Sequence, residues 1–114
     1  MTTLFDERER AAEALFALDE ELRFLAIARR NKMLGEWMCA RLNLGGGEAE
    51  AYKRRLVEAG AMPPPVGRSP DDALAERLRA ELAQRGAAAD DLPGLIARYG
   101  AEAARTVREQ ARSG

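Results

Sequence analysis

The chain has 114 residues, of which 32% are charged, 46% belong to the set AVILMFWYC and only 5% are aromatic, a balance typical of one helix-rich domain. Lysine and arginine (18) nearly cancel aspartate and glutamate (19), so no broad basic surface exists to bind nucleic acid or anionic lipid. Histidine is absent, which removes the commonest metal ligand and general base, and we expect no metal, no cofactor and no catalysis.

The N-terminal sequence MTTLFDERER contains charged residues almost immediately and does not resemble a secretory leader. Its single cysteine, Cys39, cannot form a disulfide within the chain. No stretch approaches 18 uninterrupted apolar residues, so direct insertion into a membrane is not expected. These features predict a cytoplasmic protein.

Residues 5–44 contain no proline and one glycine, Gly35, and are rich in alanine, leucine, glutamate and arginine. This composition predicts one long helix or two abutting ones. We expect residues 1–20 to form an N-terminal arm and residues 21–44 to form the first helix of the body. The charged run 6–13 is either a solvated face that frays in solution or a tip that folds upon insertion into a partner.

Apolar residues form two stripes along this segment if each residue turns the helix by about 100°. The first stripe is the natural core-facing set, which Trp37 joins, and it consists of Phe16, Phe24, Ile27, Leu34, Met38 and Leu42. The second stripe lies roughly opposite and consists of Leu15, Leu18, Leu22 and Leu25. A helix of a small protein normally carries one apolar face. The second stripe therefore packs against another helix of the bundle, against a second copy, or in the groove of a foreign partner.

The rest of the chain predicts three further helices. The Gly45-Gly46-Gly47 run ends the first helix, a second covers 48–59, and a Pro/Gly linker covers 60–69. Ser69 and Pro70 are typical of the first positions of a helix, here 70–85, with Gly86 at its end. The last helix covers 92–111. The predicted fold is all-α, a small bundle of four helices in a single domain, with a frayed N-terminal segment.

Few residues are arranged for chemistry. The cluster Arg29-Arg30-Asn31-Lys32 could bind a phosphate or an acidic patch, but such clusters are commonly solvated or paired with nearby carboxylates such as Glu36. The glycine run lacks the Lys-Ser or Lys-Thr pair of a phosphate-binding loop. Cys39 has no histidine or second cysteine as a partner, which favours a buried structural thiol.

The string FDERERAAEALFALDEELRFLAIARRNKMLGEW, residues 5–37, resembles the zeta-subunit family of ATP synthase inhibitors of alphaproteobacteria. The most specific part is Ala-Arg-Arg-Asn-Lys followed by Leu-Gly and tryptophan, residues 28–37, and the segment 46–52 also fits. The sequence differs from the family pattern at Ala12, Leu15, Leu18 and Leu25, so the second leucine stripe is partly peculiar to this chain.

The resemblance implies a four-helix inhibitor whose N-terminal region inserts between alpha and beta subunits of F1 and reaches toward gamma. Hydrolysis is then blocked while synthesis continues. It implies a protein that is a monomer when free and acts on the cytoplasmic side of the membrane-bound ATP synthase. The alternatives are a non-inhibitory assembly or stabilising partner of F1, or a small ligand-binding helical module. The expected partner-binding residues are Phe5, Asp6, Arg8, Glu9, Arg10, Glu13, Leu15, Phe16, Leu18, Asp19, Leu22 and Leu25.

Overall fold

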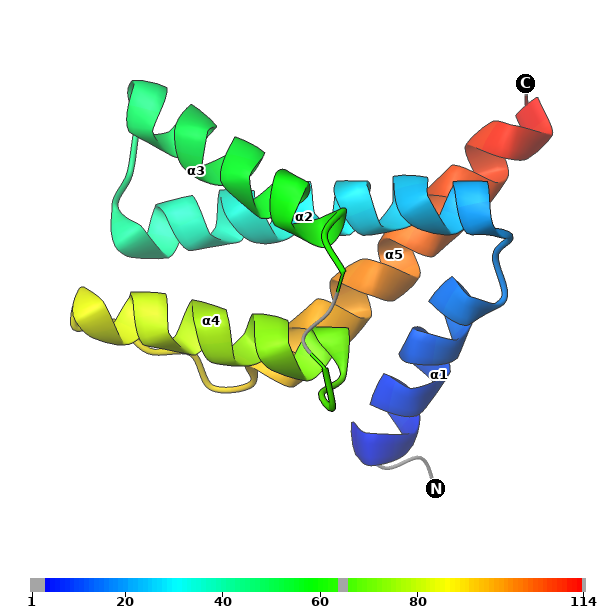
Figure 1. Ribbon diagram of the computed structural model, residues 1–114, viewed down its shortest axis with the longest axis horizontal. Coiled ribbons are helices and arrows are strands. Elements are labelled where there is room, and N and C mark those ends of the chain that lie inside the picture. The colour runs from blue at the N-terminus through cyan, green and yellow to red at the C-terminus, as the bar shows by residue number, and fades with distance from the viewer. Residues whose placement is uncertain (1–3, 64–65, 114) are drawn as a thin grey trace.

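The structure, a computed structural model, describes residues 4–63 and 66–113, apart from the side chains of residues 4, 5, 7, 11 and 12. Within these ranges the chain is all-helical, as the sequence predicts, and forms five helices (Figure 1): α1 (Leu4–Phe16), α2 (Glu20–Leu42), α3 (Gly46–Gly60), α4 (Pro70–Gln84) and α5 (Leu92–Ser113). The fifth helix arises because the expected N-terminal arm is itself a helix, separated from α2 by a short turn.

Local sequence explains most helix ends. The Ser69 hydroxyl accepts a hydrogen bond of 3.0 Å from the backbone N–H of Asp72, and Pro70 occupies the first turn of α4. α2 ends earlier than the glycine run suggests, because Asn43 adopts the left-handed conformation (φ 57°) and its N–H bonds to the Cys39 carbonyl. The glycines instead begin α3, with Gly45 as its N-cap. Pro64 and Pro65 of the expected linker lie outside the described residues.

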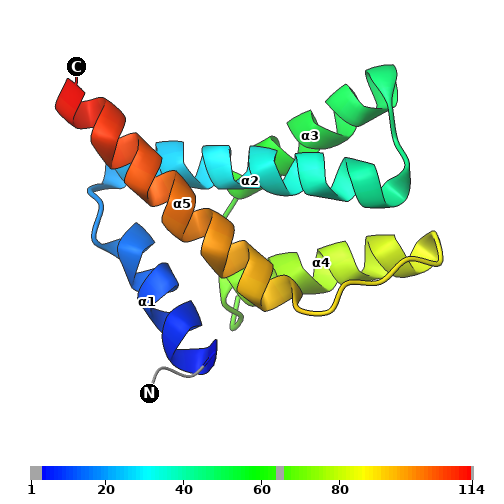
Figure 2. The same cartoon turned by 180° about the vertical axis from the view of Figure 1, so that it is seen from behind.

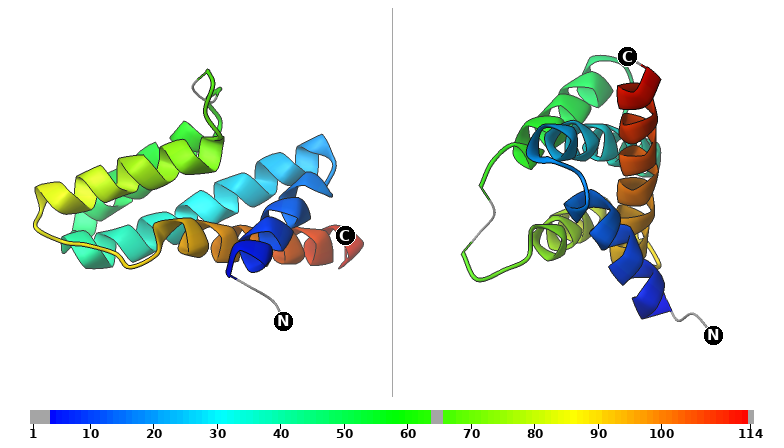
Figure 3. Two further views of the ribbon diagram at one scale, coloured as in Figure 1. Left: turned by 90° about the horizontal axis from the view of Figure 1, so that it is seen from below. Right: turned by 90° about the vertical axis from the view of Figure 1, so that its right-hand side faces the viewer.

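α2 is the central helix and contacts each of the other four helices. α3 lies alongside it, α5 crosses it, and α1 lies beside α5 (Figure 2). α4 packs mainly against the first half of α5, and Figure 3 shows the described residues between α3 and α4, 61–63 and 66–69, projecting away from the helices. This arrangement leaves the N-terminal part of α2, together with α1 and the second half of α5, as a unit at one side of the molecule.

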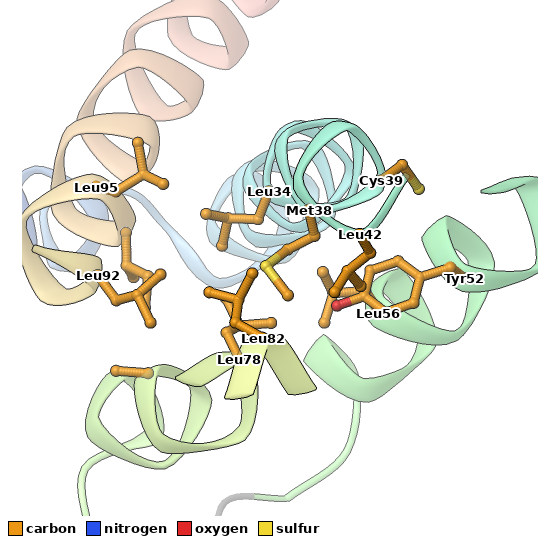
Figure 4. Packing of buried hydrophobic residues seen from close by; sticks show 12 residues of the cluster. Leu34, Met38, Cys39, Leu42, Tyr52, Leu56, Leu78, Leu82, Leu92 and Leu95 are labelled. Carbon is orange, nitrogen blue, oxygen red and sulfur yellow. The ribbon is translucent and has the colours of Figure 1, made fainter. Parts of the chain in front are cut away.

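The main core lies where α2, α3, α4 and α5 meet (Figure 4). Its residues come from the apolar stripes of all four helices. They are Leu34, Met38, Cys39, Leu42, Tyr52, Leu56, Ala75, Leu78, Leu82, Leu92, Leu95 and Ile96. Trp37 is partly buried against this cluster, and its ring faces the Arg41 guanidinium at 4.7 Å from the ring centre.

The first stripe of α2 does not stay buried along its whole length, contrary to the sequence prediction. Leu34, Met38 and Leu42 are in the core, but Phe24 is 58% exposed and Ile27 is only partly buried. The reason is the length of α3. A Cβ on Gly60, its last residue, would lie 3.1 Å from Ile27 Cγ2, so α3 ends beside Ile27 and does not extend to Phe24.

A buried polar cluster connects α2 to α3 and α4. Nη1 of Arg30, whose side chain is 6% exposed, lies 2.8 Å from Oδ1 of Asp71 at the start of α4. Arg30 Nε donates to Asn31 Oδ1 (3.1 Å), and Asn31 Nδ2 donates to the Leu56 carbonyl (3.0 Å). A Cβ on Gly60 would lie 2.5 Å from Asn31 Nδ2, so only glycine permits this approach of α3.

This cluster corrects the interpretation of residues 29–32 as a solvated basic turn. Arg30 is buried, and its carboxylate partner is Asp71, forty-one positions along the chain. Arg29 and Lys32 remain exposed. The segment that carries the most specific part of the family resemblance therefore contributes to tertiary structure.

Candidate functional site

The chain turns sharply at residues 17–19, and we refer to this turn with the adjoining helix ends, residues 15–25, as the elbow. The Arg23 guanidinium closes it from one side. Nε donates to the Leu15 carbonyl at 3.2 Å, and Nη2 donates to the carbonyls of Phe16 at 3.0 Å and Leu18 at 2.9 Å. Carbonyls at a helix end lack partners within the helix, and a cation there also complements the helix dipole. Arg23 thus fixes the end of α1.

Asp19 fixes the other side of the elbow. Its backbone is extended (φ −66°, ψ 169°), and its carboxylate accepts a hydrogen bond of 2.9 Å from the N–H of Leu22, which caps α2. The negative charge also faces the positive end of the helix dipole. Asp19, expected from the resemblance to bind a partner, therefore has a structural role in this chain, because its cap separates the arm from α2.

Two leucines of the second stripe are buried within the chain itself. Leu15 (8% exposed) and Leu18 (4% exposed) pack in a second small cluster with three residues of α5, which are Ala103, Ala104 and Val107, and with Ala26 of α2. A Cβ on Gly100 would lie 3.3 Å from Leu15 Cδ1, so glycine in the middle of α5 allows α1 to approach closely. The arm is thus docked on α5.

The other half of that stripe is not buried to the same degree. Leu22 is half-buried beside the second cluster, and Leu25 is 48% exposed. The residue of α2 that faces α5 is Ala26, which is fully buried and which the leucine pattern did not reveal. The leucine stripe therefore divides into a part that holds α1 and a part that remains open to solvent.

The exposed apolar surface of the elbow consists of Phe16, Phe24 and Leu25. Phe16, assigned to the core stripe by helical periodicity, is 72% exposed, and its ring contacts Arg23, whose guanidinium carbon lies 5.6 Å from the ring centre. The prediction for Phe16 assumed an uninterrupted helix, but the chain bends at residues 17–19 and Phe16 lies on α1, apart from the rest of the stripe. Phe24 lies on α2 beyond the end of α3 and is also more than half exposed.

The charged residues of the arm lie mostly on its outer side. Glu9, Arg10 and Glu13 are exposed, whereas Asp6 and Arg8 are partly buried. The expected contact residue Phe5 belongs to α1, but its side chain lies outside the described residues. The docked arm therefore presents a mainly charged face to solvent, interrupted at its end by Phe16.

A groove of about 880 Å³ runs beside the elbow, between α1, α2 and the start of α4. Its apolar lining includes Phe16, Ile27 and Met62, and its charged lining includes Arg8 and Arg23. Met62 is 69% exposed, so the groove continues the apolar surface that begins at Phe16. This groove could not be predicted from the sequence, because residues from five separate segments form it.

Nothing in the described residues groups three or more Cys, Asp or Glu side chains in the manner of a metal site. The Cys39 thiol is buried and donates to the Ala49 carbonyl at 3.6 Å. Burial raises its pKa, which disfavours the reactive thiolate. The buried structural role expected for this cysteine agrees with its position.

No helix in the described part of the chain is both long and apolar enough to cross a membrane. No curated protein and no solved structure matches the chain significantly. The sequence model of one family, described as ATPase inhibitor subunit zeta, matches residues 1–106, which include every helix up to the last turns of α5. Such proteins are regulatory subunits that act on ATP synthase and are not enzymes. The chain belongs to the family of ATPase inhibitor subunit zeta.

Proposed function

We propose that this protein inhibits ATP hydrolysis by F1 by inserting its N-terminal arm, residues 1–20, between an alpha and a beta subunit, toward gamma. The exposed apolar surface of the elbow carries the proposal. Phe16, Phe24 and Leu25 are large apolar side chains that their own fold leaves 48–72% exposed, at the junction of arm and body. A cluster of such residues in a chain of this family is best explained as a protein-binding surface.

The area of this apolar surface limits how much binding free energy it can supply. Full burial of an exposed large apolar side chain is worth about 1.5–3 kcal/mol, so three of them supply at most roughly 5–9 kcal/mol. A micromolar complex requires about 8 kcal/mol net, after the costs of association and ordering are subtracted. The elbow alone is therefore insufficient, and the arm must add contacts of its own.

Inhibition follows if the arm binds one state of the catalytic interface better than the others. An alpha–beta interface opens and closes in every catalytic cycle, and a helix wedged in one arrangement traps it by its differential affinity. Rotation in the hydrolytic direction is then blocked, while synthesis continues because rotation in the other direction displaces the wedge. The protein would act on the cytoplasmic side of the membrane, where F1 is located.

The test replaces an elbow residue that the fold leaves 58% exposed. Phe24→Ala should weaken inhibition of cognate F1 hydrolysis about tenfold or more, which is the loss typical of an aromatic anchor at an interface. Val66→Ala is the matched control, because Val66 is fully exposed and lies in the segment between α3 and α4. Removal of residues 1–19 should abolish inhibition altogether.

Other outcomes identify the alternatives. Co-purification with F1 without any change in hydrolysis would indicate an assembly or stabilising partner. Equal inhibition by Phe24→Ala and by the natural chain would show that the elbow is not the anchoring surface. Equal inhibition after removal of residues 1–19 would contradict insertion of the arm.

A further inference from the structure

We infer that α5 holds the arm in a stored position and that the arm must leave α5 before it can insert into F1. This inference rests on the proposed function. In the free protein, Leu15 and Leu18 are buried against α5, so an apolar face of the arm is already occupied by the protein itself. The contact between α1 and α5 is in this sense autoinhibitory.

The exposure pattern of α1 shows why release is required. A helix wedged between two subunits is contacted on more than one side. While α1 is docked, its accessible side carries Glu9, Arg10 and Glu13, and Phe16 is its exposed large apolar residue among the described side chains. Release adds Leu15 and Leu18 to the available surface, so that the arm then offers apolar side chains on two sides.

Several features of α1 and α5 favour reversible separation of the two helices. α1 has 13 residues, a length at which an isolated helix is marginal in water. The partner residues on α5 are mostly small, namely Gly100, Ala103 and Ala104, with Val107 the larger one. Small side chains allow close approach but provide few contacts each. The described side chains therefore hold the arm by the apolar contact of Leu15 and Leu18 with α5 and by the hydrogen bonds of Arg23 at the elbow.

Such a contact lowers the apparent potency of the inhibitor. If only the released arm binds F1, the apparent inhibition constant equals the intrinsic one divided by the released fraction. Any change that weakens docking without altering the arm itself must then strengthen inhibition. An ordinary structural role for the same contact predicts the reverse, because loss of structure weakens binding.

Val107 allows this test, since it lies on α5 and is 5% exposed against the leucines of the arm. Val107→Thr keeps the shape but buries a hydroxyl, and Val107→Ala removes two methyl groups. In the free full-length protein, amide exchange in α1 should rise roughly three- to tenfold, while exchange in α2–α4 stays unchanged. Inhibition of cognate F1 should become stronger by the same factor, with faster onset. Arg105→Ala, at an exposed position of α5, is the control.

Each possible result either supports or overturns the proposal that α5 stores the arm. Faster exchange in α1 together with stronger inhibition supports the stored arm. Faster exchange with unchanged or weaker inhibition overturns it, while inhibition by the natural chain leaves the proposed function intact. Unchanged exchange in α1 for both variants also overturns it, because the contact then does not hold the arm. A natural chain that neither binds nor inhibits F1 would overturn both proposals.

Discussion

The body of the molecule and its N-terminal arm are held by different kinds of contact. In the body, large side chains from four helices interlock, and Leu34, Leu56 and Leu78 have no exposed surface. Among the described side chains of the arm, Leu15 and Leu18 pack against a helix face made largely of glycine and alanine. The body also contains an ion pair whose arginine is buried, whereas the elbow is closed by side chain to backbone hydrogen bonds, two of them exposed to solvent.

We infer from this difference that the body and the arm have different functions. Regions with few buried apolar contacts open locally at a lower free energy than the whole protein unfolds, and segments that move in function come from such regions. The body supplies a rigid platform with a fixed elbow. The arm supplies a helix that can separate from that platform without disrupting it.

The largest expected effect comes from removing one leucine from each region. Leu56→Ala should lower the free energy of unfolding by about 2–5 kcal/mol, since it leaves a cavity in the main core. Leu15→Ala should lower the free energy of unfolding, measured by urea denaturation, by less than half as much, because α1 can open before the body unfolds. Equal losses would mean that arm and body form one cooperative unit, and the division proposed above would be wrong.

A smaller effect is expected at the ion pair that connects α4 to α2. Asp71→Ala should destabilise the protein by about 1–2 kcal/mol, since it leaves buried Arg30 without its carboxylate, although partial exposure of Asp71 allows water to compensate. Asp72→Ala, in the same helical turn but exposed, controls for the loss of a negative charge near the helix N-terminus and should change stability by a few tenths of a kcal/mol. Thermal unfolding of both variants distinguishes the two contributions, and equal losses would show that the pair adds nothing.

Sequence patterns predicted the body better than the arm. Helix ends at Ser69 and Gly86 follow from local chemistry, and the leucines of α4 and α5 have clear helical spacing, so these elements could be placed in advance. The turn at residues 17–19 separates Phe16 from the rest of the first stripe. Periodicity assumes an unbroken helix, and the cap at Asp19 that breaks it is visible only once its hydrogen bond to Leu22 is known.

The contacts that position the candidate site were the least predictable. Arg23 was indistinguishable in sequence from the other arginines, because its role depends on carbonyls that only the turn brings together. Glycine generally weakens the interior of a helix, yet Gly100 in the middle of α5 permits the approach of Leu15. Small residues such as Ala26 carry no strong pattern, although they define where helices meet most closely.

The smallest expected change in stability concerns a buried hydroxyl in the main core. The Tyr52 hydroxyl is the side-chain polar atom in the described residues that is buried without a hydrogen-bond partner, and Figure 4 shows it in the core near Leu56. Burial raises the pKa of Tyr52, and the nearby negative charge of Glu81 raises it further. Without the hydroxyl, Tyr52→Phe should be as stable as the natural chain near pH 7, or more stable by up to about 1 kcal/mol.

The pH dependence gives this prediction a second, independent test. A tyrosine whose pKa is higher in the folded state than in the unfolded one, about 10, contributes stability that is complete below that value and is lost as the pH rises above it. The advantage of Tyr52→Phe in urea denaturation should therefore grow above about pH 10. Tyr99→Phe controls for removing a tyrosine hydroxyl from another helix. A clear loss of stability in Tyr52→Phe at pH 7 would instead mean that the hydroxyl donates a hydrogen bond to Glu81. The Tyr52 hydroxyl would then have a hydrogen-bond partner in the core.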